Sequence, residues 1–300
     1  MTILTLVVLS PPPPALTQQP DERTALYTKY SEQKKGGAEE QKLAYETAKE
    51  FLAKFGSSQD ERILAVRKWV SSYERLLELS ALIQAKDYEK GFALGGQVLA
   101  DDPDNLYVLT KLTEAGMNSA QAGNPTFTVQ AVDFARKGIQ LIDSAKVKDP
   151  SPFANLSSAR NFFDIALATL VLDNQPEESA KIFLRLAHTD EYKTEPSIYY
   201  YFGRALLKGE YQKLVSEYKQ KYDGKPPNPE QKAALDRITQ IVTRIVDTYA
   251  RAVALSTRPE QQETKNEVLN QLLPMYKALH NNSDIGLNEL ISTVLSRPMP

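Results

Sequence analysis

The sequence contains no cysteine, only two histidines and a single tryptophan. Without cysteine the chain has no disulfide bonds, thiolate metal sites or cysteine nucleophiles, and the redox compartment stays open. His188 and His280 lie far apart in the sequence. His188, Asp190 and Glu191 combine metal-ligand types, but no second cluster accompanies them. No phosphate-binding loop, Gly-x-Ser-x-Gly motif or zinc-binding helix motif is present. We therefore expect no metal, no cofactor and no catalytic centre.

A charge of one sign and a long apolar run are also missing. The formal net charge of −2 gives no basic field, so we expect no nucleic-acid partner. The apolar stretch 3–9 is far shorter than the about 20 residues that span a bilayer, so we expect no stable membrane span. Its length fits the apolar core of a secretory signal, which is roughly 7–15 residues. We interpret residues 1–20 as a signal-like or disordered tail. If the tail is a signal, we expect the protein to be exported or periplasmic. If it is only a disordered tail, the alternative is a cytoplasmic protein.

Apolar residues recur at helical spacing through the rest of the chain, and no alternating strand pattern occurs. The helix over 259–280 is expected to be interrupted at Pro274. Glycine- and proline-containing turns separate the helices. The spacing predicts helices over residues 21–35, 38–55, 59–85, 88–100, 106–122, 129–142, 153–172, 177–187, 196–209, 210–222, 230–256, 259–280 and 283–294.

The stretch 86–112 indicates how these helices are arranged. A helix containing Gly91 and Gly95 ends at a turn around Pro103, and a new apolar period begins at Leu106. Glycines at positions where side chains would collide are typical of two helices in close contact. Because one such pair cannot bury its own apolar face, several pairs must stack.

A pattern of aromatic, small and proline residues extends this arrangement along the chain. Tyr88, Gly91 and Pro103 stand in its first unit, with Val98 at a position that favours a small residue. Partial matches follow at Leu106, Leu109, Leu112, Ala131, Ala135, Gly138, Pro176, Phe183, Tyr199, Phe202, Gly203 and Ala205. With helix pairs at a period of roughly 34 residues, the chain over about 73–222 resembles the tetratricopeptide repeat (TPR) family. No single unit carries every position of the family pattern, and Thr113 stands where the family prefers glycine.

The resemblance implies an all-α fold, a right-handed array of antiparallel helix pairs (a TPR-like α-solenoid), here with a long C-terminal helix as its cap. Such proteins bind peptides or protein segments along a concave face, lined mostly by the first helix of each pair. The resemblance thus implies a non-catalytic scaffold for protein–protein interaction, whose partner is a protein or peptide. By position it implies that the partner-binding residues are Tyr107, Thr110, Glu114, Met117, Asn118, Ser197, Tyr200, Arg204 and Lys208.

Three consecutive tyrosines fall in this predicted face. Tyr199, Tyr200 and Tyr201 cannot all face a core, because adjacent residues of a helix point about 100° apart. At least one must face solvent or a groove. Tyrosine is a favoured interface anchor, but a phenol packed at the boundary of a helix pair explains Tyr200 equally well.

Turn-rich stretches divide the chain into four predicted parts. These are the tail (1–20), a TPR-like repeat array (21–222), a Pro-rich linker (223–229) and a C-terminal helical segment that packs on the array (230–300).

Two other functions remain open. In the first, the chain is a structural or self-assembling protein, and the helix over 230–256 is the seam of a homo-oligomer. The apolar positions of this seam are Leu235, Ile238, Val242, Ile245, Tyr249 and Ala252. In the second, the chain is a helical-barrel hydrolase with paired carboxylates, which requires an acidic residue on an apolar face. Asp164, beside Phe163 and Ile165, comes nearest to this, and a hydrogen bond between helices explains it as well.

Overall fold

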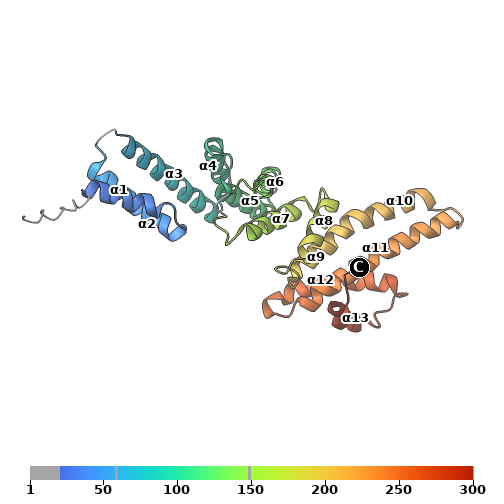
Figure 1. Cartoon of the computed structure of the whole chain (residues 1–300). Helices are drawn as coiled ribbons and strands as arrows, with labels where there is room; N and C mark the ends of the chain where they lie inside the picture. Colours follow the sequence, from blue (N-terminus) through green and yellow to red (C-terminus); the bar gives the residue numbers. More distant parts are fainter. Residues whose placement is uncertain (1–20, 58–59, 148–149, 300) are drawn as a thin grey trace, which may run out of the picture. The chain divides into compact units, whose positions relative to one another are not determined.

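The computed structural model describes residues 21–57, 60–147 and 150–299 (Figure 1). All regular secondary structure in these ranges is helical, which confirms the prediction of an all-α protein. No helix in them is both long and apolar enough to cross a membrane. Residues 1–20 lie outside the described residues, so the signal-like tail stays a prediction.

The observed helices begin and end close to the predicted limits. Asp87, Asn105 and Asn228 cap the N-termini of α4, α5 and α11, where each side chain accepts a hydrogen bond from the backbone N–H three residues on. The helices are α1 (Glu22–Gln33), α2 (Ala38–Phe55), α3 (Glu61–Gln84), α4 (Tyr88–Asp101), α5 (Leu106–Gln121), α6 (Thr128–Asp143), α7 (Leu156–Val171), α8 (Pro176–Ala187), α9 (Pro196–Leu206), α10 (Gln212–Tyr222), α11 (Pro229–Leu255), α12 (Gln262–Leu279) and α13 (Leu287–Thr293). A π-helical segment, η1 (Leu207–Tyr211), joins α9 to α10, and the short 3-10 helices η2 (Pro259–Gln261) and η3 (Val294–Ser296) precede α12 and follow α13.

The chain divides into two compact units, residues 1–77 and 78–300, and the boundary falls inside α3. This boundary differs from those predicted from turn-rich stretches, because α3 continues across it without a turn. In the first unit, α1, α2 and the start of α3 enclose a small core around Tyr30 and Phe51. The ring of Trp69 lies edge-on to Tyr30, with 5.2 Å between the ring centroids.

In the second unit, consecutive helices from α4 to α9 pack against one another. Small residues allow this close packing. A Cβ atom added to Gly116 in α5 would lie 2.3 Å from the Cβ of Ala131 in α6. At Gly95 it would lie 2.7 Å from a methyl of Leu112, whereas at Gly91 it would meet nothing closer than 3.5 Å. The close approach predicted for the stretch 86–112 therefore occurs at Gly95 and not at Gly91.

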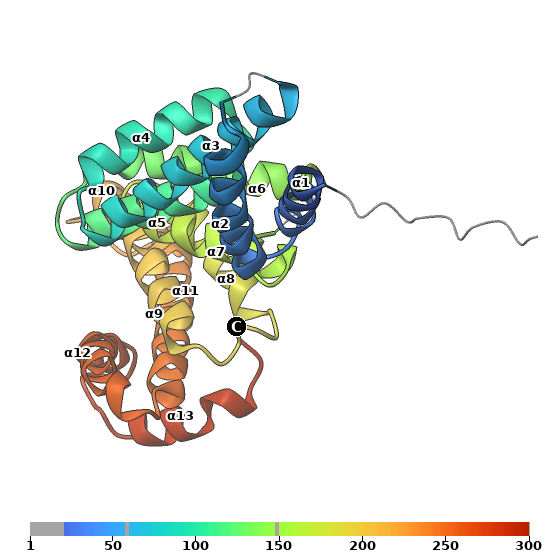
Figure 2. The same cartoon turned by 90° about the vertical axis from the view of Figure 1, so that its left-hand side faces the viewer.

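The C-terminal helices complete the core of this unit. α10 and α11 lie side by side, joined by residues 223–228 (Figure 1). The predicted linker, 223–229, covers this connection and also Pro229, the first residue of α11. α11 also packs on α9 and α12, and these three helices lie together (Figure 2). α12 continues through Pro274, contrary to the predicted interruption. Because Pro274 and Asn270 are both exposed, solvent can bond the carbonyl that the proline leaves without a donor.

The predicted oligomer seam on α11 is largely internal. Val242, Ile245 and Tyr249 are buried among side chains of the same unit. Of the seam residues, Leu235 remains exposed near the start of the helix. The apolar spacing of α11 is thus explained by packing within the chain.

Candidate partner-binding groove on helices α5, α7 and α9

The residues predicted to bind a partner lie on α5 and on the continuous helix formed by α9 and η1. α7 stands between these helices in the sequence, and it packs against α5. A pocket of about 320 Å³ opens where side chains from α5, α6, α7 and α9 meet. We call it the groove pocket. Its lining includes Met117, Thr128, Leu170, Asp173, Tyr201 and Arg204. Of the predicted residues, the structure brings Met117 and Arg204 together here.

The groove pocket combines an apolar surface with polar groups at its edge. Met117 and Leu170 supply apolar side chains from α5 and α7, and Tyr201 adds an aromatic ring from α9. Asp173, in the turn after α7, forms an ion pair with Lys208 of the π-helical segment. This pair connects another predicted residue, Lys208, to the rim of the pocket.

Arg204 is the main charged group of the groove pocket. Its guanidinium lies 5.6 Å from the ring centroid of Tyr200 and 5.9 Å from that of Tyr201, within the range of cation–π attraction. Among the described residues no carboxylate forms an ion pair with it. A half-buried arginine held by two aromatic rings is well placed to receive an anionic group, because its planar fork can bind a carboxylate through two hydrogen bonds.

Thr128, at the start of α6, adds an unsatisfied polar atom. Its Oγ1 is buried and has no hydrogen-bond partner among the described residues. Buried hydroxyl groups in folded proteins nearly always form a hydrogen bond. The Thr128 hydroxyl in the lining of the groove pocket is an exception to this rule. This hydroxyl can donate to, or accept from, a polar group that enters the pocket.

Two predicted residues are buried and present no surface to a partner. Thr110 is 3% exposed, and its hydroxyl donates to the backbone oxygen of Leu106. Tyr200 is 5% exposed and donates its hydroxyl proton to Glu267 of α12. Burial, together with this hydrogen bond, raises the pKa of Tyr200 above its ordinary value. Tyr200 therefore packs at a helix boundary, as the alternative explanation expected.

The remaining predicted residues lie outside the groove pocket. The hydroxyl of Tyr107 is 2.6 Å from the Oγ of Ser80. Glu114 forms an ion pair of 2.9 Å with Lys111 on the same helix. Asn118 and Ser197 are exposed. Their roles in binding stay predictions.

Helical geometry predicted that at least one of the three consecutive tyrosines faces solvent or a groove, and the structure leaves one of them accessible. Tyr199 and Tyr200 are buried, and Tyr201 is the one that is partly exposed and lines the groove pocket. Helical geometry alone predicts that one of the three is accessible but not which one. Sequence reasoning also missed Thr128, Leu170 and Asp173, which carry no distinctive spacing.

Asp164 is buried in an ion-pair cluster between α7 and α8. Its carboxylate contacts Arg160 one turn earlier and lies 2.5 Å from Nη2 of Arg185. Arg160 also pairs with Asp143 at 2.9 Å. This arrangement joins the two helices, in line with the structural explanation of Asp164.

The stretch around His188 has other partners. His188 Nδ1 lies 2.8 Å from the backbone oxygen of Leu184, and Asp190 pairs with Lys193. The carboxylate of Glu191 accepts a hydrogen bond from Asn161. Within the described ranges, no group of three or more metal-ligating side chains converges.

Comparison of the chain with protein-family models, curated proteins and solved structures found no match.

Proposed function

We propose that this protein is a non-catalytic scaffold that binds a segment of another protein in the groove pocket and along the adjoining faces of α5, α7 and α9. The observation that carries the proposal is the meeting of Met117, Tyr201 and Arg204 in one pocket. These residues come from two helices, α5 and α9, that the resemblance to TPR proteins had selected independently.

The proposed partner segment carries an acidic group beside an apolar side chain. Arg204 has no ion pair among the described residues, so an incoming carboxylate does not have to displace another. The pair of Lys208 with Asp173 is neutral, which leaves the positive charge of Arg204 in excess at this rim. Met117 and Leu170 offer the apolar contact, and aromatic and arginine side chains are typical interface anchors.

We further propose that α4 to α9 form a right-handed, TPR-like solenoid. Supporting this proposal, each of these helices packs on the next, and small residues such as Gly95 and Gly116 stand at the contacts. In such an array the first helices of successive pairs, here α5, α7 and α9, share one face. The groove pocket would then be part of that face.

A displayed library of random peptides, selected on the purified protein, tests the binding proposal. We expect the enriched peptides to share an acidic residue next to an apolar one. The Arg204→Gln variant should bind them at least tenfold more weakly, since a hydrogen-bonded contact to a charged group contributes roughly 1.5–3 kcal/mol.

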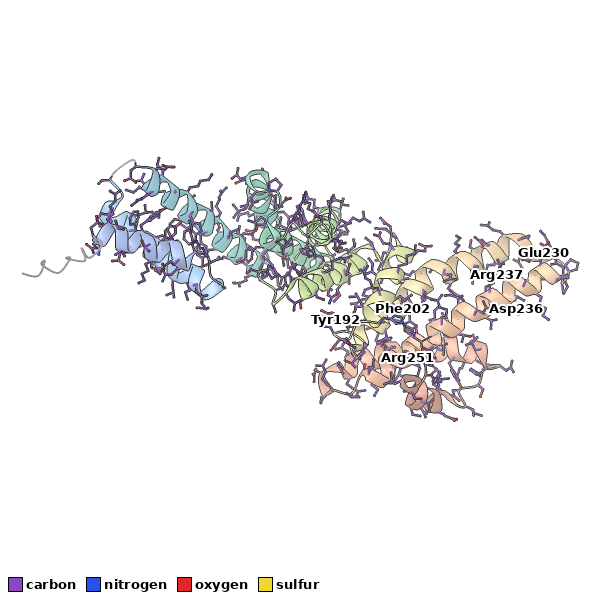
Figure 3. The ribbon with its side chains drawn as sticks, in the orientation of Figure 1. Tyr192, Phe202, Glu230, Asp236, Arg237 and Arg251 are labelled. Atoms are coloured by element: carbon purple, nitrogen blue, oxygen red, sulfur yellow. The ribbon has the colours of Figure 1, made fainter. Side chains whose placement is uncertain are left out.

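Arg237→Gln provides the matched control. Arg237 is an exposed arginine on α11, outside the groove pocket (Figure 3). This variant should bind the selected peptides as well as the unmodified protein does. If Arg204→Gln and Arg237→Gln bind them equally well, the groove pocket is not the binding site.

A further inference from the structure

A second pocket lies apart from the groove pocket, where α8, α9, α10 and α11 meet. We call it the apolar pocket. Its volume is about 250 Å³, and its floor consists of Ala180, Leu184, Phe202, Ala205 and Leu206. Figure 3 shows Phe202 on α9. This volume exceeds the roughly 150 Å³ of an apolar cavity that holds benzene, and it is below the roughly 300–1,000 Å³ of pockets for drug-sized ligands. A short apolar chain is the group that fits.

Charged side chains surround the mouth of the apolar pocket. Lys181 of α8 and Lys213 of α10 are exposed, and neither forms an ion pair among the described residues. Arg244 of α11 pairs with Glu210 at 3.3 Å. Glu177 is the other carboxylate of the rim. The three cations outnumber the two carboxylates, so the rim favours an anion.

The π-helical segment η1 shapes this site. A π-helix inserts one residue into a helical turn, and such insertions occur frequently at functional sites. Here the segment turns Lys208 toward Asp173, and it places Glu210 beside Arg244 at the rim of the apolar pocket. Gly209 allows the first residue of α8 to lie close to the π-helical segment. A Cβ added to Gly209 would lie 3.2 Å from the Cβ of Pro176.

We propose that the apolar pocket binds a small amphiphilic carboxylate, whose short hydrocarbon chain contacts Leu184 and Phe202 and whose head group lies between Lys181 and Lys213. The volume of about 250 Å³ limits the length of the chain that the apolar lining can cover. The two lysines, which come from different helices, select the negative charge. Such a ligand would bind independently of the protein segment proposed for the groove pocket.

Octanoate is the probe that tests this proposal on the full chain, with octylammonium as a ligand of equal length and opposite charge. We expect saturable binding of one octanoate, observed as changes in the NMR shifts of the Leu184 and Leu206 methyl groups. Octylammonium should bind more weakly. Lys181→Gln and Lys213→Gln should each weaken octanoate binding roughly two- to fivefold, the range of exposed ion pairs. Ala180→Leu should abolish binding by filling the floor.

Lys219→Gln is the matched control, because Lys219 is an exposed lysine of α10 that does not line the pocket. It should leave octanoate binding unchanged. The proposal is overturned if octanoate does not shift the two leucines, if octylammonium binds equally well, or if binding survives in Ala180→Leu. If Ala180→Leu fails to fold, Lys181→Gln and Lys213→Gln test the proposal instead. Both lysines are exposed, so these substitutions leave the packing of the helices unchanged. Unchanged octanoate affinity in both would refute the site.

Discussion

At the scale of single residues, Gly116 is a position where two consecutive helices, α5 and α6, leave no room for a side chain. The Cβ of an alanine there would lie 2.3 Å from the Cβ of Ala131 and 3.3 Å from the backbone oxygen of Phe127. Neither atom can move without its backbone, so Gly116→Ala must push α5 and α6 apart. We expect it to lower the free energy of unfolding by about 1–3 kcal/mol, the usual cost of overpacking. Urea denaturation measures this change.

Gly96→Ala is the control for this substitution. Gly96 is an exposed residue inside α4, and a Cβ added there meets no atom within 4 Å. Replacing a helical glycine by alanine where space is free should stabilise by about 0.5–1 kcal/mol. If both variants shift stability in the same direction, close packing at Gly116 is not what determines the result.

Tyr30 predicts how the first unit responds to alkaline pH. Its ring is 1% exposed, and burial raises the pKa of Tyr30 from 10.0 to about 12. The unfolded chain therefore loses this proton first, and the free energy of unfolding falls as the pH rises between these two values. The slope is at most about 1.4 kcal/mol per pH unit for a single group.

Tyr30→Phe should remove this part of the pH dependence and have little effect at neutral pH. Trp69, the only tryptophan, contacts Tyr30, so its fluorescence reports the unfolding of this unit. Identical alkaline profiles for the two proteins would contradict the assignment to Tyr30.

At the scale of elements, the ion pairs of Asp164 hold α7 against α8. The Asp164 carboxylate is buried, whereas Arg185 is half exposed. Removing one partner of a fully buried pair costs about 3–5 kcal/mol, and partial exposure reduces this cost. We expect Asp164→Asn to lower the free energy of unfolding by about 1–3 kcal/mol in thermal or urea denaturation.

Asp143→Asn is the matched comparison, because Asp143 contacts the same Arg160 from an exposed position. Its effect should stay below about 1 kcal/mol, as for surface ion pairs. A larger loss for Asp143→Asn than for Asp164→Asn would mean that burial does not set the strength of this cluster.

Helix positions could be predicted from the sequence, because apolar spacing and turn residues are local signals. The limits predicted for residues 38–55 are those observed for α2. The π-helical segment was not predicted, since a helix was expected to end at Gly209 and another to begin at Glu210. Its geometry depends on contacts with α8 and α11, which are distant in the sequence.

The candidate groove was predictable only in part, because it also depends on contacts between residues that are distant in the sequence. The resemblance to TPR proteins selected α5 and α9, but the rotation of α9 about its axis decides that Tyr201, and not Tyr200, lines the groove pocket. Tyr200 instead bonds Glu267 of α12, a helix far along the chain. No local pattern in residues 199–201 carries that information.

At the scale of the whole molecule, both candidate sites belong to the unit 78–300. The groove pocket uses α5, α6, α7 and α9, and the apolar pocket uses α8 to α11. The helix formed by α9, η1 and α10 contributes to both, through Arg204 in one and Phe202 and Lys213 in the other. The scaffold function that we propose would need rigid helices more than mobile loops, since the side chains of a binding site must keep their relative positions.

The most direct test of the scaffold proposal is site-specific photo-crosslinking in an extract of the cells that produce the protein. A benzophenone amino acid replaces Gln121, an exposed residue that lines the groove pocket, or Gln140, an exposed residue of α6 outside it. We predict a cross-linked protein at position 121 that is absent at position 140 and is lost when Arg204→Gln is added. Equal cross-linking at both positions, or cross-linking at 121 that is insensitive to Arg204→Gln, would contradict the proposal.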